Sequence, residues 1–325
     1  MSAASSTARP CRPDVQEFFR SGREPPEAGQ HCGMDQVVCL SARELLERGM
    51  TRHRIAEAVR RGQIVRARRD HYLPATAPAA AVEAVRVGGR LTCLSALATR
   101  GVFVFANDAL HVHVTRGASR LRAPDDRRRP LPQRADRRGL RLHWMPLARP
   151  EDADTVCVGV FDALVHAVLC QPPRYAVATL DSALNKGLIR PSDLDALFSH
   201  LPRRYRTLRR RLDGRAQAGT ESLVRVMLWK MGARAVPQVY FRGVGFVDLL
   251  VDGWLVIECD SREFHSDWRQ QVKDRERDLA LAARGYLTLR LTAAQILYRP
   301  DEVYTALRAL VQGGRPAAAS RRNSA

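Results

Sequence analysis

Acidic residues recur at close spacing in the C-terminal third of the chain. Asp248 lies in a run typical of a strand, Glu258 lies in the next such run, and Asp260 follows two residues later. Residues two apart on a strand face the same side, and a hairpin can bring Asp248 to the same edge as Glu258. Glu221, near the start of the preceding helical segment, can add a further carboxylate. Gathered carboxylates repel one another unless a cation joins them, so the pattern predicts a site for Mg²⁺ or Mn²⁺ that can activate water and stabilise charge on a scissile phosphate.

The segments around these carboxylates predict the element order α-β-β-(β)-α-β-α across residues 216–311. The first helix covers TESLVRVMLWKMG with Thr220 as its N-cap, and FVDLLVDGWLVIECD forms two strands joined by a turn at Asp252 and Gly253. A second helix ends at Gly285, and a strand, YLTLRLT, and a last helix, PDEVYTALRALV, complete the segment. The first helix and the two strands are the elements that must position the acidic residues.

The string VDLLVDGWLVIECDSREFHSDWRQQVKDRERDLALAARGYLTLRLT resembles the PD-(D/E)xK nuclease superfamily, and more closely its branch related to the very-short-patch repair endonucleases. The resemblance implies a restriction-endonuclease-like α/β fold, with Mg²⁺ or Mn²⁺ held by Asp248 and Glu258 and with Asp260 nearby. It also implies that Glu221 is the helical carboxylate of the site. His265 would act as general base or steady the attacking water.

On the helix that follows, the resemblance places Asp274 and Arg277, with Arg277 able to contact phosphate. The sequence also departs from the superfamily's pattern. Val247 stands where proline usually precedes the aspartate, Asp260 stands at the position of the lysine, and Ser261 replaces a glycine. The absent lysine removes a cation that would orient water or offset developing charge.

Residues 35–80 predict a winged helix-turn-helix. Ser41 and Glu44 form a capping box that opens one short helix, and Thr51 is a good N-cap for a second. The stretch QIVRARRDHYLP then predicts two short strands around a turn. In such a domain the second helix enters the major groove of DNA, and the wing contacts phosphates or the minor groove. The residues expected to make these contacts are Arg52, His53 and Arg60 on the helix and Arg66, Arg68 and Arg69 on the wing.

Three runs in this segment, Gly49-Met50-Thr51, Ala58-Val59-Arg60-Arg61-Gly62 and the wing from Ile64 to Tyr72, resemble the N-terminal domain of AbiEi-type antitoxins of type IV toxin–antitoxin systems. That resemblance implies binding to operator DNA. The pattern of the next segment, residues 81–200, is similar to the mixed domain that follows the winged helix in the same proteins.

Residues 81–200 predict a mixed α/β domain, with strands at ALHVHVTRG and LRLHWMP and helices at LTCLSALATRG, VFDALVHAVLC and YAVATLDSALNKG. His111 and His113 lie on one face of the first strand, and His143 lies on the second. The three could make a metal site, but no Cys, Asp or Glu completes a ligand set at short spacing, so we interpret them as ordinary strand residues. The seven cysteines include no C-x-x-C pair, which argues against a disulfide framework and a zinc ribbon.

The chain of 325 residues has 53 Lys and Arg against 34 Asp and Glu, a formal net charge of +19. Nearly all of the cations are arginines, whose guanidinium groups suit phosphates and base edges. The surplus is steepest in residues 116–141 and 200–215. Clustered charge of this size disfavours an ordinary small-metabolite enzyme and favours double-stranded DNA as the partner. The sequence shows no signal peptide and no bilayer-spanning run, so we expect a cytoplasmic protein.

These observations predict a multidomain protein of the α+β and α/β classes. We expect a winged helix-turn-helix at 35–80, a mixed α/β middle domain at 81–200, a basic linker or helix at 201–215 and a restriction-endonuclease-like α/β domain at 216–312. Residues 1–34 and 313–325 read as disordered tails.

The expected function is DNA binding joined to metal-dependent cleavage of DNA phosphodiester bonds. The alternative is a non-catalytic transcriptional regulator or an AbiEi-like antitoxin, in which a degenerate nuclease fold serves DNA binding or dimerisation. Besides double-stranded DNA, the candidate partners are a second copy of the chain and a toxin protein, and no membrane is expected.

Overall fold

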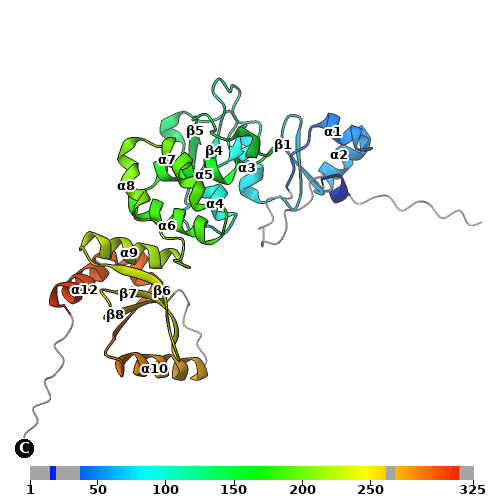
Figure 1. Ribbon diagram of the computed structural model, residues 1–325. Coiled ribbons are helices and arrows are strands. Elements are labelled where there is room, and N and C mark those ends of the chain that lie inside the picture. Colours follow the sequence, from blue (N-terminus) through cyan, green and yellow to red (C-terminus); the bar gives the residue numbers. More distant parts are fainter. Residues whose placement is uncertain (1–14, 20–36, 261–267, 315–325) are drawn as a thin grey trace, which may run out of the picture. The chain divides into compact units, whose positions relative to one another are not determined.

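The computed structural model describes residues 15–19, 37–260 and 268–314, and the chain divides into two compact units. The first unit comprises the chain up to Gly101 together with Asn107–Ala163, and the second comprises Val102–Ala106 together with the chain from Leu164 onwards. The described residues form twelve α-helices and three small sheets of two, three and four strands (Figure 1). The expected mixed α/β class is confirmed at this level. In this part of the chain no helix has both the length and the apolar character needed to cross a membrane.

The first unit opens with the two short helices that the capping residues predict. Helix α1 (Ala42–Glu47) begins after Ser41, whose hydroxyl accepts from the Glu44 N–H while the Glu44 carboxylate accepts from the Ser41 N–H. Helix α2 (Arg52–Arg60) begins after Thr51, whose hydroxyl also accepts a backbone N–H. Each cap satisfies a donor that the first turn of a helix leaves without a partner, which fixes where both helices start.

The predicted hairpin follows as β1 (Ile64–Arg68) and β2 (His71–Pro74), which pair antiparallel. Asp70 takes a left-handed backbone conformation in the turn (φ 60°), which its short polar side chain tolerates. A 3₁₀ turn at Val15–Phe19, inside the segment predicted as a tail, contributes buried side chains to the same core. The other large apolar residues of this core are Leu40, Leu45, Met50, Ile55, Ile64 and Tyr72.

The rest of the first unit is built around the three-stranded sheet. Its elements are α3 (Ala79–Val87), β3 (Arg90–Leu91), α4 (Cys93–Ala98), β4 (Leu110–His113), β5 (Leu140–His143) and the start of α5 (Val160–Cys170). The strand order is β3-β4-β5, with β4 antiparallel to β3 and parallel to β5. The sequence predicts β4, β5, α4 and α5 and misses α3 and β3. The division between the two units falls within α5, which is one unbroken helix.

The second unit continues with helices α6 (Pro173–Asn185), α7 (Leu194–Ser199) and α8 (Arg206–Arg209). The segment predicted as a basic linker or helix, residues 201–215, contains only a 3₁₀ turn at Arg203–Tyr205 and the four residues of α8. Residues 201–215 therefore do not form one continuous helix.

The four-stranded sheet carries the predicted acidic residues. Its elements follow the predicted order: α9 (Gly219–Lys230), β6 (Ala235–Phe241), β7 (Gly245–Val251), β8 (Leu255–Asp260), α10 (Trp268–Ala282), β9 (Leu287–Thr292), a short α11 (Ala293–Tyr298) and α12 (Pro300–Gly313). The strands stand in sequence order, antiparallel from β6 to β8 and parallel between β8 and β9. Parallel neighbours need a crossover connection, and α10 lies within it.

Helices cover both faces of this sheet, as Figure 1 shows: α9 and α12 lie on one side and α10 on the other. The predicted turn between β7 and β8 is confirmed, since Asp252 (φ 47°) and Gly253 (φ 74°) both take the left-handed conformation that a tight hairpin turn requires. The predicted N-cap of the first helix is wrong. Helix α9 starts earlier, with Ala218 at the N-cap, so that Glu221 rather than Thr220 provides the capping contact.

Candidate functional site

Asp248 lies where the hydrogen-bonded ladder between strands β7 and β8 of the four-stranded sheet ends. The ladder between β7 and β8 reaches the Leu249–Ile257 pair, and the next positions outward are Asp248 and Glu258. There the Asp248 carboxylate, rather than a backbone carbonyl, accepts a hydrogen bond from the Cys259 N–H at 2.7 Å. The hairpin thus brings Asp248 and Glu258 opposite each other, as the spacing of the two strands predicts.

Gln238 connects Asp248 to Glu221, and the sequence analysis did not single it out. It stands opposite Asp248 in the register of β6 and β7. Its Nε2 donates to Glu221 Oε2 at 3.1 Å and lies 3.4 Å from Asp248 Oδ1. Its backbone takes a left-handed conformation (φ 54°), which costs a non-glycine residue about 1–3 kcal/mol and tends to occur at functional sites.

Glu221 has two roles in this arrangement. It is buried at the third position of α9, and its oxygens accept the backbone N–H groups of Gln217 (3.1 Å) and Ala218 (3.0 Å). These contacts make it the capping residue of the helix. Through Gln238 it is also linked to Asp248.

The pKa values of these carboxyl groups are raised together. Burial raises the pKa of Glu221 and of Glu258 to about 7, and the charge of Asp248 is the second cause for both. Burial likewise raises the pKa of Asp248. Desolvation and like charge both disfavour ionisation, so near neutral pH Glu221 and Glu258 are poised between their protonated and charged forms. Clustered, strongly perturbed carboxyls of this kind are candidates for a functional site.

Two arginines face the carboxylates. Arg277 of α10, expected to contact phosphate, donates from Nη2 to Glu258 Oε1 at 3.1 Å, so its guanidinium is already engaged. Arg290 of β9 is the register partner of Glu258 and lies 4.0 Å from Asp260 Oδ2, while it also bonds Asp278 at 2.9 Å. Arg290 therefore provides a cation beside Asp260.

The carboxylates do not form a compact ligand set in this arrangement. Within the described residues, one group of His, Cys, Asp and Glu side chains has ligand atoms close enough together to hold a metal ion. That group lies elsewhere, in the first unit and α5. The predicted general base, His265, and Ser261 lie outside the described residues. The structure therefore links Glu221 to Asp248 through Gln238 and places Arg290 beside Glu258 and Asp260.

The predicted DNA-binding residues of α2 are accessible. Arg52, His53 and Arg60 are all exposed, and α2 ends at Arg60. Arg69 is exposed at the turn of the hairpin. These four side chains are thus exposed on α2 and at the turn between β1 and β2, and their contact with DNA stays a prediction.

Two wing arginines are placed differently from the prediction. Arg68 lies against the end of α3, where a Cβ added to Gly88 would come within 2.2 Å of Arg68 Nη1, and burial lowers the pKa of Arg68. Arg66 is half-buried beside the Tyr72 ring, and its carbonyl accepts from Arg127 Nη1 at 3.0 Å. Both side chains pack inward because β1 lies against α3 and the loop after β4, whereas Arg69 stays exposed.

The basic loop that holds Arg127 is anchored at several points. Arg86 of α3 donates to the Pro124 carbonyl at 2.6 Å, and a bridge joins Arg122 to Pro130. Ala123 is fully buried beneath the loop. The loop therefore presents its exposed arginines, Arg128 and Arg129 among them, from a fixed base within the first unit.

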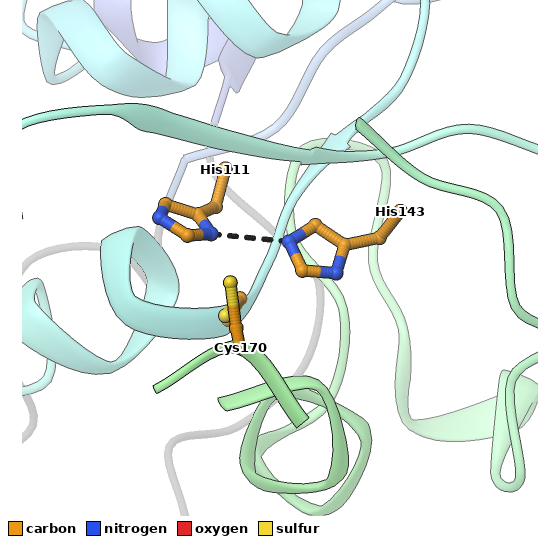
Figure 2. Close-up of side chains that lie close together, drawn as sticks. His111, His143 and Cys170 are labelled. Carbon is orange, nitrogen blue, oxygen red and sulfur yellow. Dashed lines mark hydrogen bonds between the residues drawn. The ribbon is translucent and has the colours of Figure 1, made fainter. Parts of the chain in front are cut away.

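Two of the strand histidines, which we interpreted as ordinary strand residues, lie in a group with two cysteines. His111 Nδ1 and His143 Nε2 lie 3.0 Å apart, with Cys170 beside them (Figure 2). Cys93 completes the group, and the four potential ligand atoms lie within 4.8 Å of one another. The spacing of residues in the sequence does not reveal this group, because its four members come from four different elements of secondary structure.

Comparison of the chain with models of protein families, with curated proteins and with solved structures finds no match.

Proposed function

We propose that the protein binds double-stranded DNA and that its second unit hydrolyses DNA phosphodiester bonds with the help of Mg²⁺ or Mn²⁺. The observation that carries this proposal is the link from Glu221 through Gln238 to Asp248, which has Glu258 beside it, with pKa values near 7 for the two glutamates. The element order α-β-β-β-α-β and the positions of the carboxylates agree with the resemblance to the PD-(D/E)xK superfamily.

The donor set suits a hard divalent cation. Asp248 and Glu258 offer carboxylate oxygens, which Mg²⁺ and Mn²⁺ prefer, and such an ion would offset the repulsion that helps to raise the pKa of Glu258. The ion would supply a polarised phosphate and an activated water. Arg290, beside Asp260, is positioned to offset negative charge that develops on the phosphate. His265 keeps the predicted role of proton acceptor.

The first unit would hold the DNA. Arg52, His53 and Arg60 on α2 and Arg69 on the hairpin are exposed cations or donors at the positions from which a winged helix contacts DNA. The exposed arginines of the anchored basic loop extend the cationic surface of this unit. Phosphate contacts of this kind set affinity and register and leave chemistry to the acidic site.

A plasmid-nicking assay tests the proposal. The full-length protein should nick supercoiled plasmid when Mg²⁺ or Mn²⁺ is present, and Asp248→Asn and Glu258→Gln should each reduce the rate roughly 100-fold or more. Asp301→Asn, an exposed acidic change at the start of α12, is the matched control and should leave the rate unchanged. DNA binding without cleavage in either metal would refute the enzyme.

One observation favours a second candidate, a DNA-binding regulator with a degenerate nuclease fold. Asp248 and Glu258 already have protein partners, the Cys259 N–H and Arg277. A regulator of this kind would retain the affinity and sequence selectivity of DNA binding in Asp248→Asn and Glu258→Gln and would cut under no condition. A second copy of the chain or a toxin protein would then be the expected protein partner.

A further inference from the structure

Two cysteines and two histidines meet at the sheet of the first unit. His111 lies on β4 and His143 on the neighbouring parallel strand β5, two positions beyond the register partner of His111, so both rings project from the same face. Cys93 is the first residue of α4, and Cys170 is the last residue of α5. Figure 2 shows the two imidazole rings turned toward each other, with Cys170 beside them.

The dimensions of the group match those of a tetrahedral zinc site. Zn–N bonds of about 2.0–2.1 Å and Zn–S bonds of about 2.3 Å place the ligand atoms of a tetrahedron roughly 3.3–3.8 Å apart. The two imidazole nitrogens are separated by 3.0 Å, and all four ligand atoms lie within 4.8 Å of one another. An ion at the centre therefore requires adjustments of an ångström or less.

The chemistry of the donors selects zinc rather than a hard cation. Thiolate sulfur and imidazole nitrogen bind Zn²⁺ well and bind Mg²⁺ and Ca²⁺ poorly. Cys93 is completely buried and His111 is only 2% exposed, whereas His143 and Cys170 are half-buried, so the group lies at the edge of the buried core. Four protein ligands leave no open coordination position, which is the pattern of a structural site rather than a catalytic one.

The backbone around Cys93 is constrained in a way that fits this role. Cys93 takes a left-handed conformation (φ 54°), which costs a residue with a side chain about 1–3 kcal/mol. The adjacent Thr92 N–H donates to the His111 carbonyl at 3.0 Å, and the His111 N–H donates to Ser95 Oγ at 3.1 Å. These two bonds fasten the start of α4 to β4, so the positions of the Cys93 and His111 backbones are set together.

A third histidine of this region, His113, does not belong to the group. His113 lies on the same strand face as His111 and is buried, but its Nε2 meets the Met145 carbonyl at 2.9 Å. It is therefore committed to a backbone partner outside the group. Cys93, His111 and His143 belong to the first unit, and Cys170 is carried by the unbroken helix α5 that starts there.

We propose that Cys93, His111, His143 and Cys170 bind one structural zinc ion. The ion would tie α4, β4, β5 and the end of α5 together and hold the middle of the chain in its folded form. This proposal is independent of the proposed nuclease function, because it involves none of the carboxylates of the second unit.

Metal analysis of the full-length protein, purified without a metal-affinity tag, tests the assignment. We expect about one zinc ion per chain and little magnesium after dialysis. Cys93→Ser and Cys170→Ser should each lower the zinc content at least several-fold. Cys157→Ser, at a buried cysteine of the first unit outside the group, and Asp248→Asn should retain it. Equal zinc in wild type, Cys93→Ser and Cys170→Ser would overturn the proposal.

Cobalt substitution of the wild type covers the case in which the cysteine variants do not fold. Co²⁺ replacing the ion should give the visible absorption of a tetrahedral centre and a thiolate-to-cobalt charge-transfer band. Titration with Zn²⁺ should abolish both signals at about one equivalent, since zinc binds such sites more tightly than cobalt. Absence of stoichiometric zinc together with absence of a tetrahedral cobalt spectrum would refute the site.

Discussion

Raising the pH should destabilise the second unit, because two of its buried carboxyl groups lose their protons in the folded state. The pKa values of Glu221 and Glu258 are raised from 4.5 to about 7, with burial as the main cause and the charge of Asp248 as the second. Between these two values the folded protein holds protons that the unfolded chain releases. The free energy of unfolding therefore falls as pH rises through this window and is constant above it.

The size of the effect follows from the same values. One pKa unit corresponds to about 1.36 kcal/mol, so each carboxyl moved from 4.5 to about 7 reduces the stability by roughly 3 kcal/mol above pH 7 relative to pH 4. The groups interact through Asp248, so the combined loss is of this order rather than a simple sum. A loss of several kcal/mol is a large part of the stability of a typical domain.

Asp248→Asn separates repulsion from burial. Without the Asp248 charge, the pKa values of Glu221 and Glu258 should fall toward their ordinary range, although burial still raises them. The variant should be more stable than wild type at about pH 8, and its stability should depend less on pH. Asp301→Asn, whose carboxylate is exposed in the first turn of α12, should lower the stability above pH 7 by ~1 kcal/mol or less and leave the slope unchanged.

Urea unfolding at several pH values between about 5 and 8 measures these differences, with fluorescence of Trp254, which is buried in the core under α9, as a reporter in the second unit. A wild-type stability that stays constant across this range would contradict the buried, mutually repelling carboxylates. So would an Asp248→Asn curve that runs parallel to that of wild type.

Two further predictions concern arginine contacts. Asp181→Ala should destabilise the protein by about 3–5 kcal/mol in thermal or urea unfolding, because it removes the fully buried carboxylate that pairs with Arg225. Asp195→Ala, which breaks an exposed ion pair, should cost ~1 kcal/mol or less. Equal losses in the two variants would contradict the difference in burial. Arg69→Ala should reduce the salt dependence of the DNA-binding constant by about one counterion in anisotropy titrations. Arg68→Ala should lower the free energy of unfolding and leave that salt dependence unchanged. The reverse result would support the DNA contact first predicted for Arg68.

Local signals in the sequence predict most of the helices and strands correctly. Ser41 and Thr51 fix the starts of α1 and α2, and the turn at Asp252 and Gly253 fixes the β7–β8 hairpin, because each depends on residues within one turn of the chain. Helix α3 was missed because only Glu83 and Arg86 interrupt its run of small apolar residues, so its exposed side has a weak signal in the sequence. Strand β3 was missed because it has only two residues.

The candidate sites depend in part on contacts between distant segments, which local sequence patterns do not predict. Asp248 and Glu258 could be predicted to meet because a single hairpin joins them. Gln238 and Arg290 could not, because their positions opposite these residues depend on the pairing of β6 with β7 and of β8 with β9. The inward packing of Arg68 likewise depends on α3, a helix that the sequence analysis did not find.

The cysteine–histidine group and the carboxylate group make opposite demands on a metal, and this affects how any chelation experiment is interpreted. A thiolate and imidazole shell releases zinc slowly and couples its loss to unfolding, whereas an oxygen site exchanges Mg²⁺ readily. Loss of nicking after brief EDTA treatment, reversed by Mg²⁺ alone, would therefore assign the activity to Asp248 and Glu258. Loss that also needs Zn²⁺ for recovery would instead report the folding of the segment that holds Cys93 and His111. Since both groups lie in one chain, sensitivity to a chelator identifies neither site until the restoring ion is known.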